Sequence, residues 1–121
     1  MLDSGKPWPV SYESRMSVWQ FGADLTLAIL PGEVVGEYVP VVERAVGPMD
    51  LWPVGYSNDY FGYLPTRRVQ EQGGYEARDF ITGWGYLDRG TEDAVVKKLK
   101  ELAAQVGRPV PATEPRITFP L

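Results

Sequence analysis

Residues 25–54 read LTLAILPGEVVGEYVPVVERAVGPMDLWPV and contain a strand, a helix and a second strand in succession. The apolar run Leu25–Leu30 stops abruptly at Pro31-Gly32-Glu33, as buried strands do. The segment Glu33–Ala45 then places apolar residues close to helical spacing, and Pro40 should kink this helix or delay its start.

Gly47-Pro48 closes the predicted helix, and Leu51–Tyr56 follows as a second short strand. Pro53 cannot donate to a strand ladder, so this strand is expected at an edge or a bulge of the sheet. Two strands in strand–helix–strand order that share a sheet are parallel and are joined by a right-handed crossover. We therefore expect a mixed α/β fold built on this unit.

A third strand is predicted before this unit. Met16–Phe21 and Leu25–Leu30 are apolar runs separated by Gly22-Ala23-Asp24, which is typical of a β-hairpin. The second run is apolar on both faces, as in a strand that is covered on both sides. One face has Leu25, Leu27 and Ile29, and the other has Thr26, Ala28 and Leu30.

Two further helices are predicted after the sheet. Thr66 is a candidate N-cap for a short helix that ends near Gln72. The clearest helix has Thr91 as its predicted N-cap, an apolar stripe that ends at Val106, and a stop at Gly107. This amphipathic helix and the helix after Glu33 should cover the small mixed sheet.

The chain is expected to form a single domain over residues 1–121. Residues 1–14 are unpatterned and are predicted to form an N-terminal arm. Residues 108–121 are a Pro-rich C-terminal tail, in which Arg116–Phe119 is expected to add as a further strand.

Charge and composition exclude several classes of protein. The 121 residues include 12 Lys and Arg against 16 Asp and Glu, a formal charge of −4, and no Cys or His. Disulfides, thiolate nucleophiles and His-dependent triads therefore cannot be completed within this chain. The acidic pI of about 4.8 argues against nucleic-acid binding.

The sequence also bears on membrane segments and location. No apolar run approaches the roughly 20 residues of a transmembrane segment. The start lacks a signal-peptide pattern, and together these features predict a cytoplasmic location.

The stretch Ser57–Tyr86 is dense in Gly and aromatic residues, and long loops of this kind are uncommon unless they have a function. Glu33, Tyr63 and Tyr75 are the chemically interesting residues in and near it. Considered singly, Glu33 is explained as a residue that stabilises a helix start. Tyr63 and Tyr75 are explained singly as packing residues with hydroxyls at the rim.

Considered together, the motifs around these residues resemble the end of the catalytic domain of the neutral/alkaline (non-lysosomal) ceramidase family. Members of that family have a strand ending in L-P-G-E, a helix and a strand, an asparagine-containing turn, and a Y-E-A motif. The twelve-residue step from Tyr63 to Tyr75 matches the family's pair of site tyrosines, and the resemblance covers about Ser17 to Gln105. The matching segments are Leu30–Glu33, Asn58–Tyr63, Leu64–Arg67 and Gly74–Ala77.

The resemblance implies part of a zinc site. In this family two histidines, a glutamate and a tyrosine hold zinc, and a zinc-bound water attacks the N-acyl amide of a sphingolipid. Glu33 and Tyr63 would be metal ligands, and Tyr75 would be the catalytic residue that hydrogen-bonds the developing oxyanion. Because this chain has no His, the metal site is incomplete, and zinc is expected only if a partner chain completes it.

Four residues are predicted to contact a substrate: Asn58, Tyr60, Arg67 and Trp84. Asn58 belongs to the asparagine-containing turn, and Tyr60 and Trp84 belong to the aromatic stretch. Arg67 stands at a helix start, where a phosphate or carboxylate is favoured. The alternatives are that Arg67 offsets nearby carboxylates at the surface and that Trp84 fills a small core.

Three functions follow from these observations. The first is an assembly or binding module that is not catalytically competent alone and that forms a homo-oligomer, such as a dimer, or binds a partner chain. The second is one part of a split zinc-dependent amide hydrolase acting on N-acyl sphingolipid-like substrates. The third is a small-molecule-binding domain with an aromatic pocket. On the resemblance, the chain is a terminal fragment, one chain of a split enzyme, or a free-standing relic.

Overall fold

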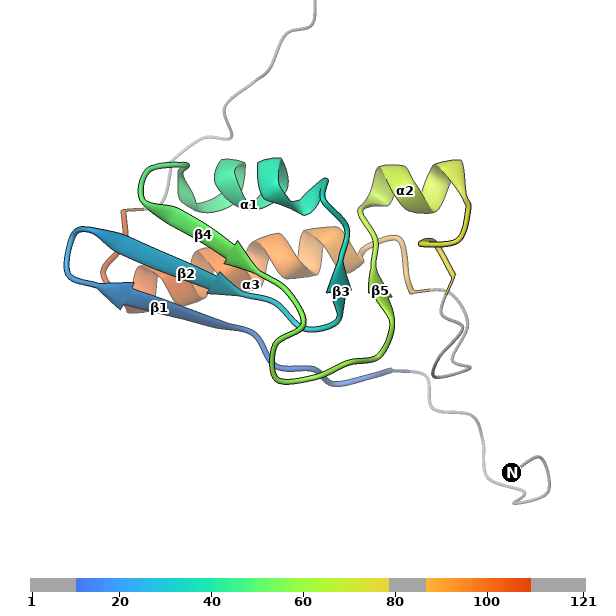
Figure 1. Cartoon of the computed structure of the whole chain (residues 1–121), viewed down its shortest axis with the longest axis horizontal. Coiled ribbons are helices and arrows are strands. Elements are labelled where there is room, and N and C mark those ends of the chain that lie inside the picture. Colours follow the sequence, from blue (N-terminus) through green and yellow to red (C-terminus); the bar gives the residue numbers. More distant parts are fainter. Residues whose placement is uncertain (1–10, 79–86, 110–121) are drawn as a thin grey trace, which may run out of the picture.

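The structure is a computed structural model that describes residues 11–78 and 87–109. It confirms a small mixed α/β fold with an amphipathic helix near the C-terminus (Figure 1). The strands are β1 (Ser17–Phe21), β2 (Leu25–Ile29), β3 (Glu33–Val34), β4 (Leu51–Val54) and β5 (Tyr63–Leu64). The helices are α1 (Tyr38–Val46), α2 (Arg67–Gln72) and α3 (Thr91–Gln105).

The main sheet has the strand order β1-β2-β4. β1 and β2 form the predicted antiparallel hairpin, in which Trp19 is paired with Leu27. β2 and β4 are parallel, as the strand–helix–strand order predicts, and Pro53 lies on an edge strand. A second, two-stranded sheet pairs β3 with β5 in parallel, and the sequence patterns do not predict it.

The helix after Glu33 begins later than its apolar spacing suggests. Glu33 and Val34 form β3, and α1 begins only at Tyr38. Pro40 is then the third helical residue, where its missing N–H falls among the unbonded donors of the first turn. The prediction that Pro40 delays the start is therefore confirmed, and the assignment of Glu33 to the helix is wrong.

The two later helices are found close to their predicted positions. Thr66 caps α2, since its hydroxyl accepts a hydrogen bond from the backbone N–H of Val69. Thr91 is not the cap of α3 but its first residue, and Gly90 holds the cap position without a side-chain hydrogen bond. The predicted strand Arg116–Phe119 and most of the arm and tail lie outside the described residues.

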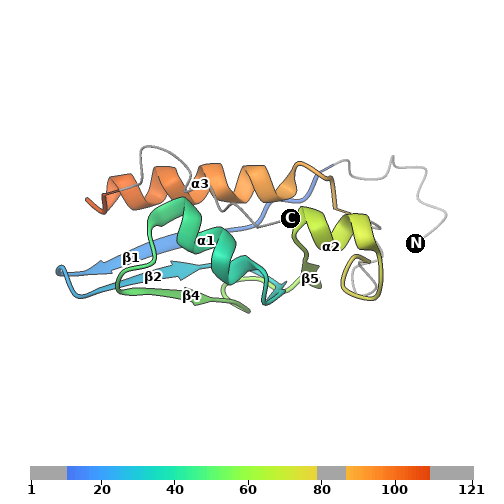
Figure 2. The same cartoon turned by 90° about the horizontal axis from the view of Figure 1, so that it is seen from above.

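Both long helices pack on the same face of the main sheet (Figure 2). α3 lies along β1 and α1 lies toward β4, and the two helices also contact each other. The side chains buried between these layers are Val18, Ala28, Leu30, Tyr38, Val41, Val42, Ala45, Val46, Val95, Leu99 and Ala103. None of the described helices is long and apolar enough to cross a bilayer.

The opposite face of the main sheet has no covering layer among the described residues. Trp19 on β1 and Trp52 on β4 are 56% and 64% exposed, and Leu25, Leu27 and Ile29 of β2 are only half-buried. The expectation that β2 is covered on both sides is therefore wrong for the described part of the chain.

Candidate functional site

Glu33 is positioned by a close backbone crossing between residues 30–35 and residues 54–64. Gly32 donates its N–H to the carbonyl of Asp59 at 2.9 Å, and Glu33 donates to the carbonyl of Gly62 at 2.8 Å. Gly32 has a φ of +69°, and a Cβ built there would lie 2.8 Å from the Gly62 oxygen. The glycine of L-P-G-E is therefore required at this crossing.

Glu33 and Tyr63 are direct neighbours across the β3–β5 pair. Their Cα atoms are register partners in the parallel ladder, so both side chains start from the same side of this small sheet. Both side chains are half-buried. The structure thus brings together the two residues predicted as metal ligands, although thirty positions separate them in the sequence.

Tyr75 joins this pair through Tyr63. The rings of Tyr63 and Tyr75 meet edge to face with centroids 5.5 Å apart, an arrangement favoured by the aromatic quadrupole. Burial, reinforced by the negative charge of Glu33, raises the pKa of Tyr63 above its ordinary value. Tyr63 is therefore a protonated hydroxyl at neutral pH.

Tyr56 also belongs to the site, and no sequence motif points to it. Hydrogen bonding of its hydroxyl to the carboxylate of Glu33 is the largest cause that raises the pKa of Tyr56 to about 12. The backbone of Tyr56 has a φ of +53° and is held by a 2.8 Å hydrogen bond to the Gly32 carbonyl. A non-glycine residue in this region stores about 1–2 kcal/mol of strain.

Tyr60 completes the group, since its ring stacks on that of Tyr56 with centroids 5.8 Å apart. We call these five residues the Glu33 cluster: Glu33, Tyr56, Tyr60, Tyr63 and Tyr75. Tyr56, Tyr60 and Tyr75 are 63%, 47% and 61% exposed, so a ligand from solvent can reach them. The carboxylate of this cluster can accept a hydrogen bond from an amide N–H of a ligand. The carboxylate and the surrounding rings can also attract a cationic group.

The residues present do not form a zinc site by themselves. Zinc sites use three or four protein ligands, and Glu33 and Tyr63 are two. No group of three or more acidic residues that could hold a metal occurs within residues 11–78 and 87–109.

Of the four predicted substrate contacts, only Tyr60 is placed in the Glu33 cluster. Asn58 lies in the turn that precedes Tyr60, where it is exposed and has a left-handed φ of +68°. Arg67 bonds elsewhere: its guanidinium pairs with Asp93 and its Nε donates to the Arg89 carbonyl, near the start of α3. Trp84 lies outside the described residues.

Asp59 fastens the segment before β1 to the loop that carries the cluster. It accepts hydrogen bonds from the Tyr12 hydroxyl at 2.7 Å and from the Ser14 hydroxyl at 3.0 Å, and these bonds help to lower its pKa. The ring of Tyr12 meets Phe61 edge to face at 5.5 Å. The residues before the hairpin thus support the loop from which Tyr60 projects.

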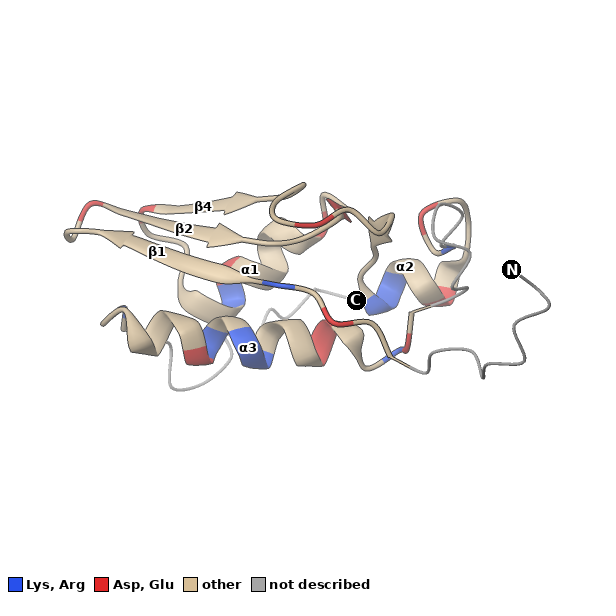
Figure 3. Ribbon diagram, turned by 90° about the horizontal axis from the view of Figure 1, so that it is seen from below, with Lys and Arg blue, Asp and Glu red and all other residues tan. Residues whose placement is uncertain are grey.

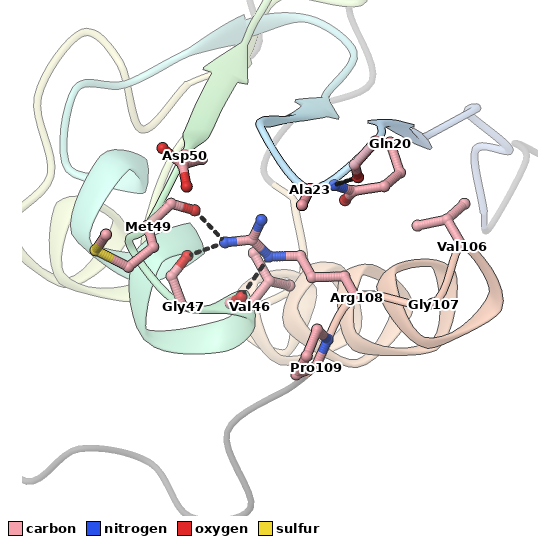
Figure 4. A pocket seen from close by; sticks show the side chains of 11 residues that line it. Gln20, Ala23, Val46, Gly47, Met49, Asp50, Val106, Gly107, Arg108 and Pro109 are labelled. Atoms are coloured by element: carbon pink, nitrogen blue, oxygen red, sulfur yellow. Dashed lines mark hydrogen bonds between the residues drawn. The ribbon is translucent and has the colours of Figure 1, made fainter.

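A hollow of about 590 Å³ lies between the end of α3, the end of α1 and the β1–β2 turn (Figure 4). Arg108 occupies it and donates to the carbonyls of Val46, Gly47 and Met49 at 2.6–2.8 Å, and to the hydroxyl of Thr26. Because these donors are engaged by the chain itself, we assign this hollow to the fold rather than to a ligand. By sequence, Arg108 is only the first residue of the predicted tail.

Comparison with protein-family models, with curated proteins and with solved structures found no significant match. The resemblance to the ceramidase family therefore stays a prediction, which rests on the motifs quoted above.

Proposed function

We propose that this chain is a binding and assembly module that presents half of a ceramidase-like site at the Glu33 cluster and is not catalytic on its own. The pairing of Glu33 with Tyr63 across β3 and β5 is the observation that supports this proposal most. The contacts of Tyr56 and Tyr75 with that pair add to it. The ligand class that fits is an N-acyl amide with a polar head, since the amide donates to Glu33 and the phenols donate to its carbonyl.

Binding without turnover is the direct test. A short-chain N-acyl amino alcohol, titrated into the full chain, should shift the tyrosine ring signals in NMR saturably and should not be hydrolysed. Glu33→Gln and Tyr63→Phe should each weaken binding at least tenfold, and Glu43→Gln, which makes the same change on α1 outside the cluster, should leave it unaltered. Absence of binding to the wild-type chain would overturn the proposal.

A second candidate is one part of a split zinc-dependent amide hydrolase. It is favoured by the same adjacency of two oxygen ligands, with the imidazole ligands supplied by a partner chain, as the resemblance implies. Equilibrium dialysis of the isolated chain against Zn²⁺ should then show no stoichiometric binding. Addition of a His-bearing partner should give one zinc per complex, which Glu33→Gln removes. A complex that holds no zinc would exclude this candidate and leave the binding module in place.

A further inference from the structure

The face of the main sheet that no element of residues 11–78 and 87–109 covers is an apolar surface. In strand register, Trp19, Leu27 and Trp52 form one row across β1, β2 and β4. The rows on either side place Phe21 beside Leu25 and Ile29 beside Val54. We call these seven residues the tryptophan face: Trp19, Phe21, Leu25, Leu27, Ile29, Trp52 and Val54.

This face has no charged residue on any of its three strands. The strand sequences SVWQF, LTLAI and LWPV contain no Lys, Arg, Asp or Glu. Figure 3 shows the charges on the helices, in the turns and loops, and on the segment that leads into β1. Asp24 and Asp50 lie in turns that adjoin the strands. The face therefore offers no ion pair to a charged partner, and two copies of it meet without repulsion between strand residues.

The exposed area is large enough for a symmetric pair. Trp19, Phe21 and Trp52 are 56%, 49% and 64% exposed, which leaves roughly 400 Å² of aromatic surface if a fully exposed ring offers about 200–250 Å². A dimer would bury about twice that area, because each copy contributes its own three rings. The half-buried aliphatic residues raise the total buried area toward the ~1,200 Å² of a stable interface.

We propose that the tryptophan face binds the same face of a second copy of this chain, giving a two-fold dimer in which the sheets stack. A surface that is uncharged and apolar can be self-complementary, as an isologous interface requires. The pairing covers β2 on both sides, as its two apolar faces suggest. The proposal does not rest on the Glu33 cluster, so each can fail without the other.

Sedimentation equilibrium of the full chain tests the dimer. The wild-type chain should be dimeric, and the double substitution Trp19→Lys with Trp52→Lys should raise the dimer dissociation constant about thirtyfold or more, as expected for buried tryptophan hot spots. Met49→Lys is the matched control, because Met49 is 73% exposed but lies between α1 and β4, off the strands.

Two results would overturn the proposal. One is a wild-type chain that is monomeric at all concentrations. The tryptophan face would then not bind a second copy, and its binding partner would be the chain's own terminal residues or a different protein. The other is a dimer that persists in the double variant while circular dichroism shows that the variant is folded.

A second measurement decides the matter if the double variant does not fold. The chain has no cysteine, so single spin labels can be attached at two substituted positions. One is Ser17→Cys, since Ser17 is the register partner of Ile29 and adjoins the tryptophan face, and the other is Lys97→Cys, on the exposed side of α3. Stacked sheets lie about 10 Å apart, so the Ser17 labels should be much closer across the dimer than the Lys97 labels. Loss of the dimer on labelling Ser17→Cys alone also supports the proposal, and closer Lys97 labels would overturn it.

Discussion

Glu33 is held where two backbone segments cross, and the residues around it are constrained by that crossing. Gly32 donates to Asp59, Glu33 donates to Gly62, and Tyr56 donates back to Gly32. Each of these bonds links L-P-G-E to the loop that brings Tyr56 and Tyr63 to the carboxylate. The position of the candidate site therefore depends on backbone geometry at single residues.

Gly32→Ala should destabilise the protein by about 2–4 kcal/mol, because a Cβ clashes with the Gly62 carbonyl and the left-handed backbone adds strain. Urea unfolding followed by circular dichroism measures this loss. Gly36→Ala is the matched control, since nothing lies within 4 Å of its added Cβ, and its effect should stay below about 0.5 kcal/mol. Equal effects of the two substitutions would contradict a close backbone crossing at Gly32.

The hydrogen bond between Tyr56 and Glu33 should be visible in a tyrosine titration. Glu33→Gln should lower the pKa of Tyr56 from about 12 toward its ordinary value near 10, because the carboxylate that raises it is gone. The pKa of Tyr56 is measured from the absorbance of tyrosinate as a function of pH. The variant Tyr56→Phe identifies which transition belongs to Tyr56, and Glu76→Gln is the control. An unchanged transition in Glu33→Gln would show that the bond is absent.

The same bond sets a pH dependence of stability. The folded pKa of Tyr56 lies above the unfolded value, so its contribution is complete below about pH 10 and is lost as the pH rises through about 12. The free energy of unfolding should therefore decrease more between pH 9 and pH 11.5 in the wild-type chain than in the Tyr56→Phe variant. Urea unfolding at the two pH values measures both decreases. If stability falls in parallel in the two proteins, the Tyr56 hydroxyl contributes nothing to the pH dependence.

Elements far apart in the chain are joined by a few polar side chains. Glu37, just before α1, accepts from Thr66 at the start of α2 and pairs with Arg68, which lowers the pKa of Glu37. Arg108, after α3, binds the last carbonyls of α1 and the hydroxyl of buried Thr26 on β2. The carbonyl of Val46 at the end of α1, which the helix itself leaves unbonded, thus accepts from a residue that follows α3.

Arg108→Met should reduce the free energy of unfolding by about 2–4 kcal/mol, because several backbone carbonyls and Thr26 lose a charged donor. Arg108→Lys keeps the charge without the planar fork and should recover less than half of the loss. Urea denaturation of both variants is the measurement, with Lys97→Met on the exposed side of α3 as control. Full recovery by Lys would show that charge alone matters.

In the part of the chain that the structure describes, α1 and α3 form one layer on one face of the three-stranded main sheet, and the hydrophobic core cluster lies between the two layers. Leu99 of α3 is fully buried in that core. Leu99→Ala should therefore destabilise the fold by about 2–5 kcal/mol, with coincident transitions by tryptophan fluorescence and circular dichroism. Leu102→Ala, at a half-buried position of the same helix, should cost clearly less, and non-coincident transitions would argue against one cooperative unit.

The amino-acid order alone predicted the hairpin, the parallel β2–β4 pair, α2 with its Thr66 cap, and α3 to within one residue. These features depend on apolar spacing and turn residues that lie within a few positions of one another. The order alone did not predict the β3–β5 pair, the place of Tyr56 beside Glu33, the contacts of Arg67 and Arg108, or the face of β2 that the described residues leave uncovered. Each of these depends on which distant segments pack together, and that is set by the core and the backbone crossing at Gly32.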